Sequence, residues 1–180
     1  NMVDPEKWVN PLRGYAYDSF NKDALLRLAK VEDGRMTLPG GVSYKVLVVP
    51  LPRPMNPEQA ELSPEVEKKI NELKKAGILI PDLPYTGDDF SAYGLERDLI
   101  VPEDVAWTHR RGEQGDIYFI ANQREETRTF TASMRIYGRK PECWNPLTGE
   151  IDFRPSYEQK NNRTEVTLTL APNESVFIVY

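Results

Sequence analysis

The chain has 180 residues, of which 39% are hydrophobic and 28% charged, with a net charge of -5 and an isoelectric point near 5.1. This composition is ordinary for a soluble globular protein of one large or two small domains, and the acidic balance gives no reason to expect nucleic acid or an anionic membrane as a partner. The longest apolar run, Val46–Leu51, is far shorter than the roughly 18 residues of a membrane helix. The single cysteine excludes a disulfide or a cysteine-cluster metal site within the chain.

The chain divides into two compositional parts. Residues 1–100 contain all of the helical signal, whereas residues 101–180 have almost entirely the pattern of strands. We therefore predict an α+β chain of two parts, a small and partial α/β domain over residues 1–100 followed by an antiparallel β-sandwich over residues 101–180. Because the chain begins with Asn1 and shows no signal peptide, we expect a fragment or processed piece whose N-terminus does not reveal the compartment.

A short helix and a hairpin are predicted near the start. Asn21–Lys30 begins with a capping residue and places Leu25, Leu28 and Ala29 on one apolar stripe, which is typical of a helix. Asp33-Gly34 follows, and this dipeptide favours a two-residue hairpin turn.

A βαβ unit is predicted next. Tyr44–Val49 is apolar apart from Lys45, which is typical of a strand that is covered on both faces. Ser63–Gly77 has the signals of a helix, with a capping serine, a proline at the first helical position and a terminal glycine. Ile78–Ile80 then has the pattern of a short buried strand. We interpret Pro81–Asp98, which is polar and rich in turn residues, as a linker or long surface loop.

The second part alternates apolar and polar residues at a period of two. This pattern predicts about seven strands, roughly ten residues apart, as in an antiparallel sandwich. The predicted strands are residues 105–110, 116–123, 129–137, 141–145, 150–154, 164–170 and 175–180.

His109, the only histidine, shares a strand face with Trp107. A ligand contact or general base is one interpretation, and a histidine packed on the sandwich is the other. We favour the structural interpretation because no carboxylate or nucleophile at a suitable spacing accompanies it. The acidic residues Asp88, Asp89, Glu96 and Asp98 lack the alternating spacing of a calcium loop, so a solvated loop is favoured over a metal site.

The segment Pro141–Ile151 contains the ingredients of a catalytic surface and also those of a hairpin. Glu142 and Glu150 flank a turn and raise the question of a carboxylate pair for glycoside hydrolysis, but no enclosing pocket is evident. We interpret the segment as two short strands, with Trp144 packed inside or along the sheet edge. Glycine-rich nucleotide motifs are absent, and we expect neither cofactor nor metal.

Six runs taken in order resemble one family. They are Gly14-Tyr15 with Tyr17-Asp18 and Asn21; Asp33-Gly34-Arg35 with Leu38-Pro39 and Ser43-Tyr44; Val46-Leu47-Val48-Val49-Pro50; Trp107 with His109-Arg110; Asp116-Ile117-Tyr118-Phe119 with Ala121-Asn122-Gln123; and Trp144-Asn145-Pro146 with Thr148-Gly149-Glu150-Ile151. Over nearly the whole chain this set resembles the region downstream of the catalytic barrel in glycoside hydrolase family 106, the α-L-rhamnosidase-like proteins common in gut Bacteroidetes.

The resemblance implies a parent several times longer, with an upstream catalytic (β/α)8 barrel that supplies the catalytic glutamates. It further implies that the first part is similar to an amidotransferase-like or flavodoxin-like domain, or to a β-galactosidase trimerisation-type domain. No catalytic residue can be carried over to this chain. The implied partner is the catalytic domain of the same parent chain, and the implied location is periplasmic or secreted.

These observations lead to an expected function and two alternatives. We expect a non-catalytic accessory region of a glycoside hydrolase acting on complex polysaccharide, in which the region supports the barrel. The candidate cleft-rim or sugar contacts are Tyr15, Tyr17, Asp18, Trp107, His109 and Trp144. The first alternative is a carbohydrate-binding module that uses Tyr85, Phe90, Tyr93 and Trp144 as exposed stacking platforms. The second is a self-contained hydrolase that uses Glu142.

Overall fold

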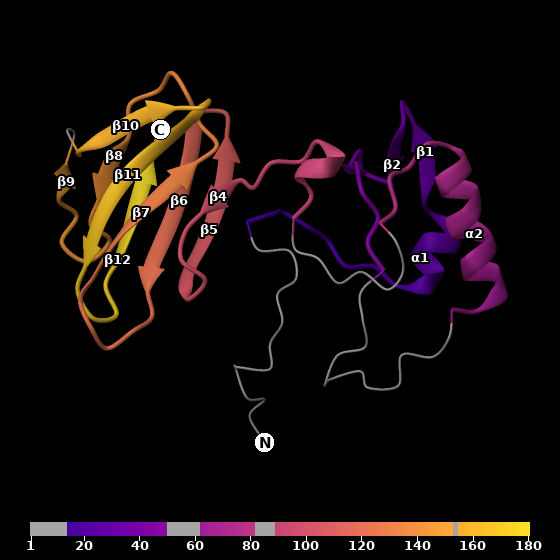
Figure 1. The fold of residues 1–180 in the computed structure, drawn as a ribbon, viewed down its shortest axis with the longest axis horizontal. Helices are drawn as coiled ribbons and strands as arrows, with labels where there is room; N and C mark the ends of the chain where they lie inside the picture. The colour runs from indigo at the N-terminus through magenta and orange to yellow at the C-terminus, as the bar shows by residue number, and fades with distance from the viewer. Residues whose placement is uncertain (1–13, 50–61, 82–88, 153–154) are drawn as a thin grey trace. The chain divides into compact units, whose positions relative to one another are not determined.

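The computed structural model describes residues 14–49, 62–81, 89–152 and 155–180, which belong to two compact units, Asn1–Leu95 and Glu96–Tyr180 (Figure 1). Each unit has its own cluster of buried apolar side chains. The sequence prediction placed the division after residue 100, whereas in the structure β4 (Leu99–Ile100) pairs with a strand of the second unit. None of the helices in the described ranges is long and apolar enough to span a membrane.

The first helix of unit 1 is shorter than predicted. α1 (Lys22–Arg27) begins after Asn21, whose side-chain oxygen accepts a hydrogen bond from the backbone N–H of Ala24 at 3.0 Å, as expected of an N-cap. Its C-cap is Leu28, which is exposed rather than part of the apolar stripe. The reason is that the chain leaves the helix there and begins the next strand at Lys30.

The predicted hairpin of unit 1 is confirmed. β1 (Lys30–Glu32) and β2 (Arg35–Thr37) pair antiparallel, and the two turn residues Asp33 and Gly34 have φ values of 51° and 70°. Positive φ at both central positions is the conformation that the Asp-Gly dipeptide favours in a tight hairpin. β3 (Ser43–Tyr44) adds to β2 and completes a three-stranded sheet.

The helix of the predicted βαβ unit is confirmed, but its flanking strands are minimal. α2 (Pro64–Lys75) buries Val66, Ile70 and Leu73 on one face. On either side of α2 the chain forms a parallel bridge between Val46 and Leu79, as expected for a crossover. The prediction that Tyr44–Val49 is covered on both faces is wrong for the described residues, because only Leu47 is buried there.

Unit 2 is a β-sandwich of two antiparallel sheets, as predicted (Figure 1). One sheet has the order β10-β11-β7-β4 and the other the order β5-β6-β12-β8-β9. The seven predicted strands are all present, whereas β4 and β10 were not predicted. The bounds are β5 (Val105–Gly112), β6 (Gly115–Asn122), β7 (Arg128–Met134), β8 (Glu142–Trp144), β9 (Ile151–Asp152), β10 (Tyr157–Lys160), β11 (Arg163–Leu170) and β12 (Ser175–Val179).

The core of the sandwich lies between the two sheets and consists of the inward-facing residues of alternating strands. Tyr118, Ile120 and Ile178 face it from the five-stranded sheet and Ala132, Met134 and Val166 from the four-stranded sheet, all essentially without exposure. Side chains of this kind each stabilise the folded state by about 1.5–3 kcal/mol on full burial. The sheets are therefore held by packing, and polar side chains inside this layer need partners of their own.

Candidate functional site

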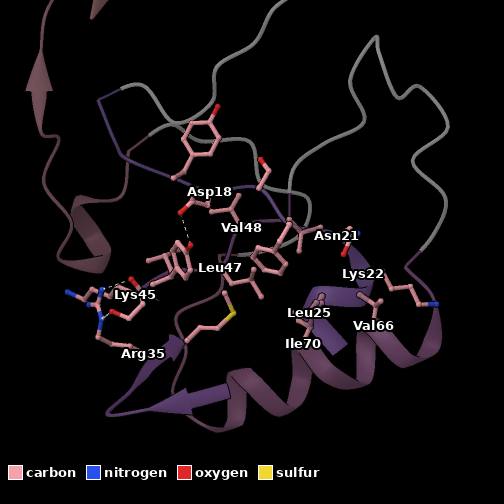
Figure 2. A pocket seen from close by; sticks show the side chains of 18 of the residues that line it. Asp18, Asn21, Lys22, Leu25, Arg35, Lys45, Leu47, Val48, Val66 and Ile70 are labelled. Carbon is pink, nitrogen blue, oxygen red and sulfur yellow. Dashed lines mark hydrogen bonds between the residues drawn. The ribbon is translucent and has the colours of Figure 1, made fainter. Parts of the chain in front are cut away.

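Unit 1 contains a pocket of about 680 Å³. Figure 2 shows Leu25 from α1 and Val66 and Ile70 from α2 projecting toward Leu47, so the floor of the pocket is part of the apolar core of this unit. Polar groups lie at its border, among them the carboxylate of Asp18, which accepts a hydrogen bond from the Tyr44 hydroxyl at 2.6 Å. This bond raises the pKa of Tyr44. The pocket therefore combines an apolar floor with a polar border.

The three candidate residues of the first loop have different roles in the structure. Tyr17 and Asp18 both line the pocket, and Tyr17 is exposed. The hydroxyl of Tyr15 instead accepts a hydrogen bond from the backbone N–H of Phe90 at 2.9 Å, and its ring packs edge-on against that of Phe90 at 5.0 Å. Tyr15 thus holds the segment that leads into the 3-10 helix η2 (Ser91–Tyr93).

A cluster of charged side chains surrounds His109 in unit 2. Its Nδ1 lies 2.6 Å from Oδ2 of Asp98, and its Nε2 lies 3.0 Å from Oδ1 of Asp116. The imidazole ring stacks on the phenol ring of Tyr118, with centroids 4.0 Å apart and planes at 7°. The Tyr118 hydroxyl also donates to Oδ1 of Asp98 at 3.2 Å. We call Asp98, His109, Asp116 and Tyr118, with the arginines described next, the His109 cluster.

Four arginines complete the His109 cluster. Arg111 donates through Nε to Oδ1 of Asp116 at 2.7 Å, and Arg139 donates through Nη1 to Oδ2 of the same carboxylate at 3.1 Å. Arg135 forms an ion pair with Asp98 at 3.6 Å. Arg163 is partly buried and donates to backbone carbonyls, that of Asp98 included. The cluster therefore provides hydrogen-bond and ion-pair partners for two buried carboxylates, Asp98 and Asp116.

The contacts of His109 match a doubly protonated ring. An ionised carboxylate accepts hydrogen bonds and donates none, so both ring nitrogens can donate to carboxylates only when the ring is an imidazolium. Burial alone lowers the pKa of His109, but the carboxylates of Asp98 and then Asp116 outweigh it, and the pKa is raised above its usual value. For Asp98 and Asp116 burial alone raises the pKa, and the cations around them outweigh it, so both pKa values are lowered.

The stability of unit 2 is expected to depend on pH through His109. Its stabilising contribution is present in full below pH 6.5, the ordinary pKa, and is lost as the pH rises through the higher pKa of the folded state. The contributions of Asp98 and Asp116 have the opposite sign, being present above pH 3.8 and lost as the pH falls through their lowered pKa values. We expect the wild-type chain to lose free energy of unfolding from about pH 6.5 upward relative to His109→Gln.

The measurement is urea unfolding at intervals from pH 5 to 9 for both proteins. The interpretation is simple because the chain has one histidine and because burial raises the pKa of Cys143 to about 11. Parallel pH profiles for wild type and His109→Gln would show that the imidazolium does not stabilise the fold.

The carboxylates of the His109 cluster were not predicted from the sequence. Asp98 is buried rather than part of a solvated loop, and the prediction that no carboxylate accompanies His109 is wrong. Asp88, the first residue of the acidic group considered for calcium, lies outside the described residues. Asp116 could have been found from hairpin register, since Arg111 pairs with Asp116 and His109 with Tyr118 across β5 and β6.

Trp107 and Trp144, the remaining candidates, are not brought together. Trp107 lies on β5 two residues before His109 and packs against the sandwich core. Trp144 lies on β8, separated from β5 by β6 and β12 in the sheet. It is 38% exposed, so of the two predicted placements, inside or along the sheet edge, the first is wrong, and β8 lies next to the edge strand β9. Its ring N–H donates to Glu142 at 2.9 Å.

The fold is that of a β-rich chain in which a sandwich follows a small unit whose described residues include the α-helices α1 and α2. The family model of glycoside hydrolase family 106, described as alpha-L-rhamnosidase, matches residues 2–88 and 85–159. The chain belongs to this family, as the ordered motifs of the sequence predicted.

Two known proteins are similar over almost the whole chain. A protein of Formosa agariphila named "Putative beta-glucuronidase" is 27% identical over 206 aligned residues, which cover 93% of this chain and 17% of that protein. The structure of a rhamnosidase from Novosphingobium sp. PP1Y superimposes with a TM-score of 0.73 at 22% identity, over 93% of this chain and 20% of that one. The chain thus spans about a fifth or less of the length of these relatives.

Proposed function

We propose that the chain is a non-catalytic accessory region of a glycoside hydrolase of the α-L-rhamnosidase type that acts on complex polysaccharide. The observation that carries the proposal is coverage, since 93% of the chain matches only 17% of one relative and 20% of the other. Catalytic chemistry on a sugar needs two carboxyls about 5–9 Å apart on either side of the scissile bond. Asp98 and Asp116 are instead occupied by His109 and arginines, which supports a structural role for them.

The proposed partner of the region is the catalytic barrel of the same parent chain. On this proposal unit 1 is part of a larger α/β domain of the flavodoxin-like or amidotransferase-like kind. The parallel bridge between Val46 and Leu79 on either side of α2 supports it, because such crossovers build doubly wound sheets. The proposed rim contacts of this unit are Tyr17 and Asp18 at the border of the pocket, with Tyr15 positioning the loop behind them.

The test of the accessory role is hydrolysis by the 180-residue chain itself. We expect the purified chain to release no p-nitrophenol from the α-L-rhamnoside or the β-glucuronide, with the complete parent protein as the positive control. Folding of the chain is confirmed first by dispersed amide resonances of unit 2. Hydrolysis that is lost on Glu142→Gln would contradict the accessory role and establish the chain as a hydrolase.

A carbohydrate-binding module remains the second candidate, and one observation favours it. Trp144 is exposed with its ring orientation fixed by Glu142, as a stacking platform requires. Phe90 is excluded from such a role because it is buried against Tyr15. Tyr93 is only partly exposed, and Tyr85 lies outside the described residues. Binding of a neutral oligosaccharide that is lost on Trp144→Ala would favour this candidate.

A further inference from the structure

Three exposed guanidinium groups belong to the His109 cluster, and each is held by a buried carboxylate. The side chains of Arg111, Arg135 and Arg139 are 67%, 46% and 56% exposed, yet each reaches a carboxylate that is almost completely buried. Arg111 uses its Nε and Arg139 one Nη for Asp116. Among the described residues, the outer N–H groups of these two side chains have no carboxylate partner.

Positive charge exceeds negative charge in this cluster. Two carboxylates, Asp98 and Asp116, face the three exposed arginines, the His109 imidazolium and the partly buried Arg163. Glu96 is the further acidic group near Arg163. The excess is local, because the chain as a whole carries a net charge of -5. A concentrated positive patch on an acidic protein attracts anions to one place on the surface.

The arginines are also pre-organised. Asp116 holds Arg111 and Arg139 by opposite oxygens of one carboxylate, so the two guanidinium groups lie beside each other. The backbone carbonyl of Arg139 accepts a hydrogen bond from the side chain of Gln159 at 2.7 Å, which fixes the loop that carries it. Guanidinium groups match carboxylates by paired hydrogen bonds, and side chains already ordered lose less entropy when they bind.

An exposed aromatic residue lies in the same loop. Tyr137 stands between Arg135 and Arg139 in the sequence and is 58% exposed, so its ring is accessible to a ligand. Sugar rings stack on exposed aromatic faces, and acidic sugars add a carboxylate that pairs with arginine. This combination favours a saccharide over a simple inorganic anion.

We propose that Arg111, Arg139 and Arg135 bind the carboxylate of an acidic saccharide, with Tyr137, from the loop that carries Arg135 and Arg139, as a contact for the sugar ring. The choice of a saccharide rests on the proposed function, whereas the anion site rests on the cluster alone. Asp116 positions Arg111 and Arg139, and Asp98 positions Arg135. The site gives the accessory region a ligand of its own, a uronic-acid unit of the polysaccharide.

The test uses the 180-residue chain and trigalacturonate as the probe. Binding is measured by titration calorimetry and by the Nε–Hε resonances of Arg111 and Arg139, which shift only if the probe reaches them. We expect binding that weakens with added salt and falls about tenfold in the double variant Arg111→Gln/Arg139→Gln, because two charge-assisted contacts are lost. The matched control is Arg110→Gln/Lys74→Gln, which removes the same charge from exposed positions, on the outer face of β5 and on α2, and should bind as wild type does.

Several outcomes would overturn the proposal. Equal binding of the neutral galactose trisaccharide would make the site independent of the carboxylate and would favour the aromatic binding module. Equal binding of acetate would show an anion site without saccharide recognition, and tighter binding of polyglutamate would indicate a protein partner. Unshifted Nε–Hε resonances in wild type would place any binding elsewhere, whether or not the variants fold. The hydrolysis assay is independent of all of these results, so failure here leaves the accessory role to be judged separately.

Discussion

Asp116→Asn is expected to lower the free energy of unfolding of unit 2 by about 3 kcal/mol. The substitution keeps the shape of the side chain and removes its charge. His109, Arg111 and Arg139 then lose the carboxylate that all three contact, at distances of 3.0, 2.7 and 3.1 Å. The expected loss is at the lower end for buried ion pairs, because Arg111 and Arg139 keep contact with water.

Asp104→Asn is the matched control. Asp104 also accepts hydrogen bonds from two arginines, Arg124 and Arg128, each at 2.8 Å. Its side chain is 33% exposed, against 6% for Asp116, so the same substitution is expected to lower the free energy by about 1 kcal/mol or less. Urea unfolding followed through amide resonances of β6 and β7 isolates unit 2 from unit 1. Equal losses for the two variants would mean that burial does not strengthen the Asp116 contacts.

The strands of unit 2 were predictable because each carries a clear period of two. In β7 the buried residues Phe130 and Ala132 alternate with the exposed Thr129 and Thr131, and their partners on β11 do the same. β10 was not predicted, because Tyr157–Lys160 is polar and too short to show a period of two. The sequence feature that could have indicated β10 is the turn after it. Asn161 and Asn162 both have positive φ there, a conformation that asparagine tolerates.

The His109 cluster was only half predictable. Asp116 follows from counting residues across the hairpin of β5 and β6, a local relation. Asp98 does not, because it reaches His109 only through the pairing of β4 with β7 in the opposite sheet. A two-residue strand has no periodicity, and its position is decided by the packing of the sandwich. Long-range contacts of this kind are invisible to patterns along a single sequence.

The first unit shows a related limit. Val46–Val49 is apolar without a break, and this pattern predicts a strand that is buried on both faces. In the structure these residues line the pocket, and Leu47 is the buried one. An apolar run indicates that its residues are suited to apolar contacts. It does not identify the residues that make those contacts.

Tyr118→Ala is expected to be the most destabilising single substitution in the sandwich, with a loss of about 3–5 kcal/mol. Tyr118 has no exposed surface, and its ring lies between His109 and the edge-on ring of Tyr180, whose centroid is 6.3 Å away. Truncation to alanine leaves a cavity between the sheets and removes the hydroxyl that donates to Asp98. Its neighbour Phe119 is the control, because it is less buried and its ring packs against that of Phe177, with the ring centroids 5.1 Å apart.

Phe119→Ala is expected to lower the free energy of unfolding by about 1 kcal/mol, the upper end of the range for a cross-strand pair, so a similar loss for both alanine variants would contradict the assignment of the core. Tyr118→Phe removes the hydroxyl and keeps the ring, and it should lower the free energy of unfolding by about 1 kcal/mol, since Asp98 retains its contacts with His109 and Arg135.

The ring of Tyr118 also lies face to face with the imidazolium of His109, which adds an attraction of about 1 kcal/mol between cation and π-system. A double-mutant cycle between Tyr118→Leu and His109→Gln measures that attraction directly. The coupling should be present at pH 5.5 and disappear as His109 loses its proton at higher pH, and a coupling that does not change with pH would show that the stack depends on shape alone.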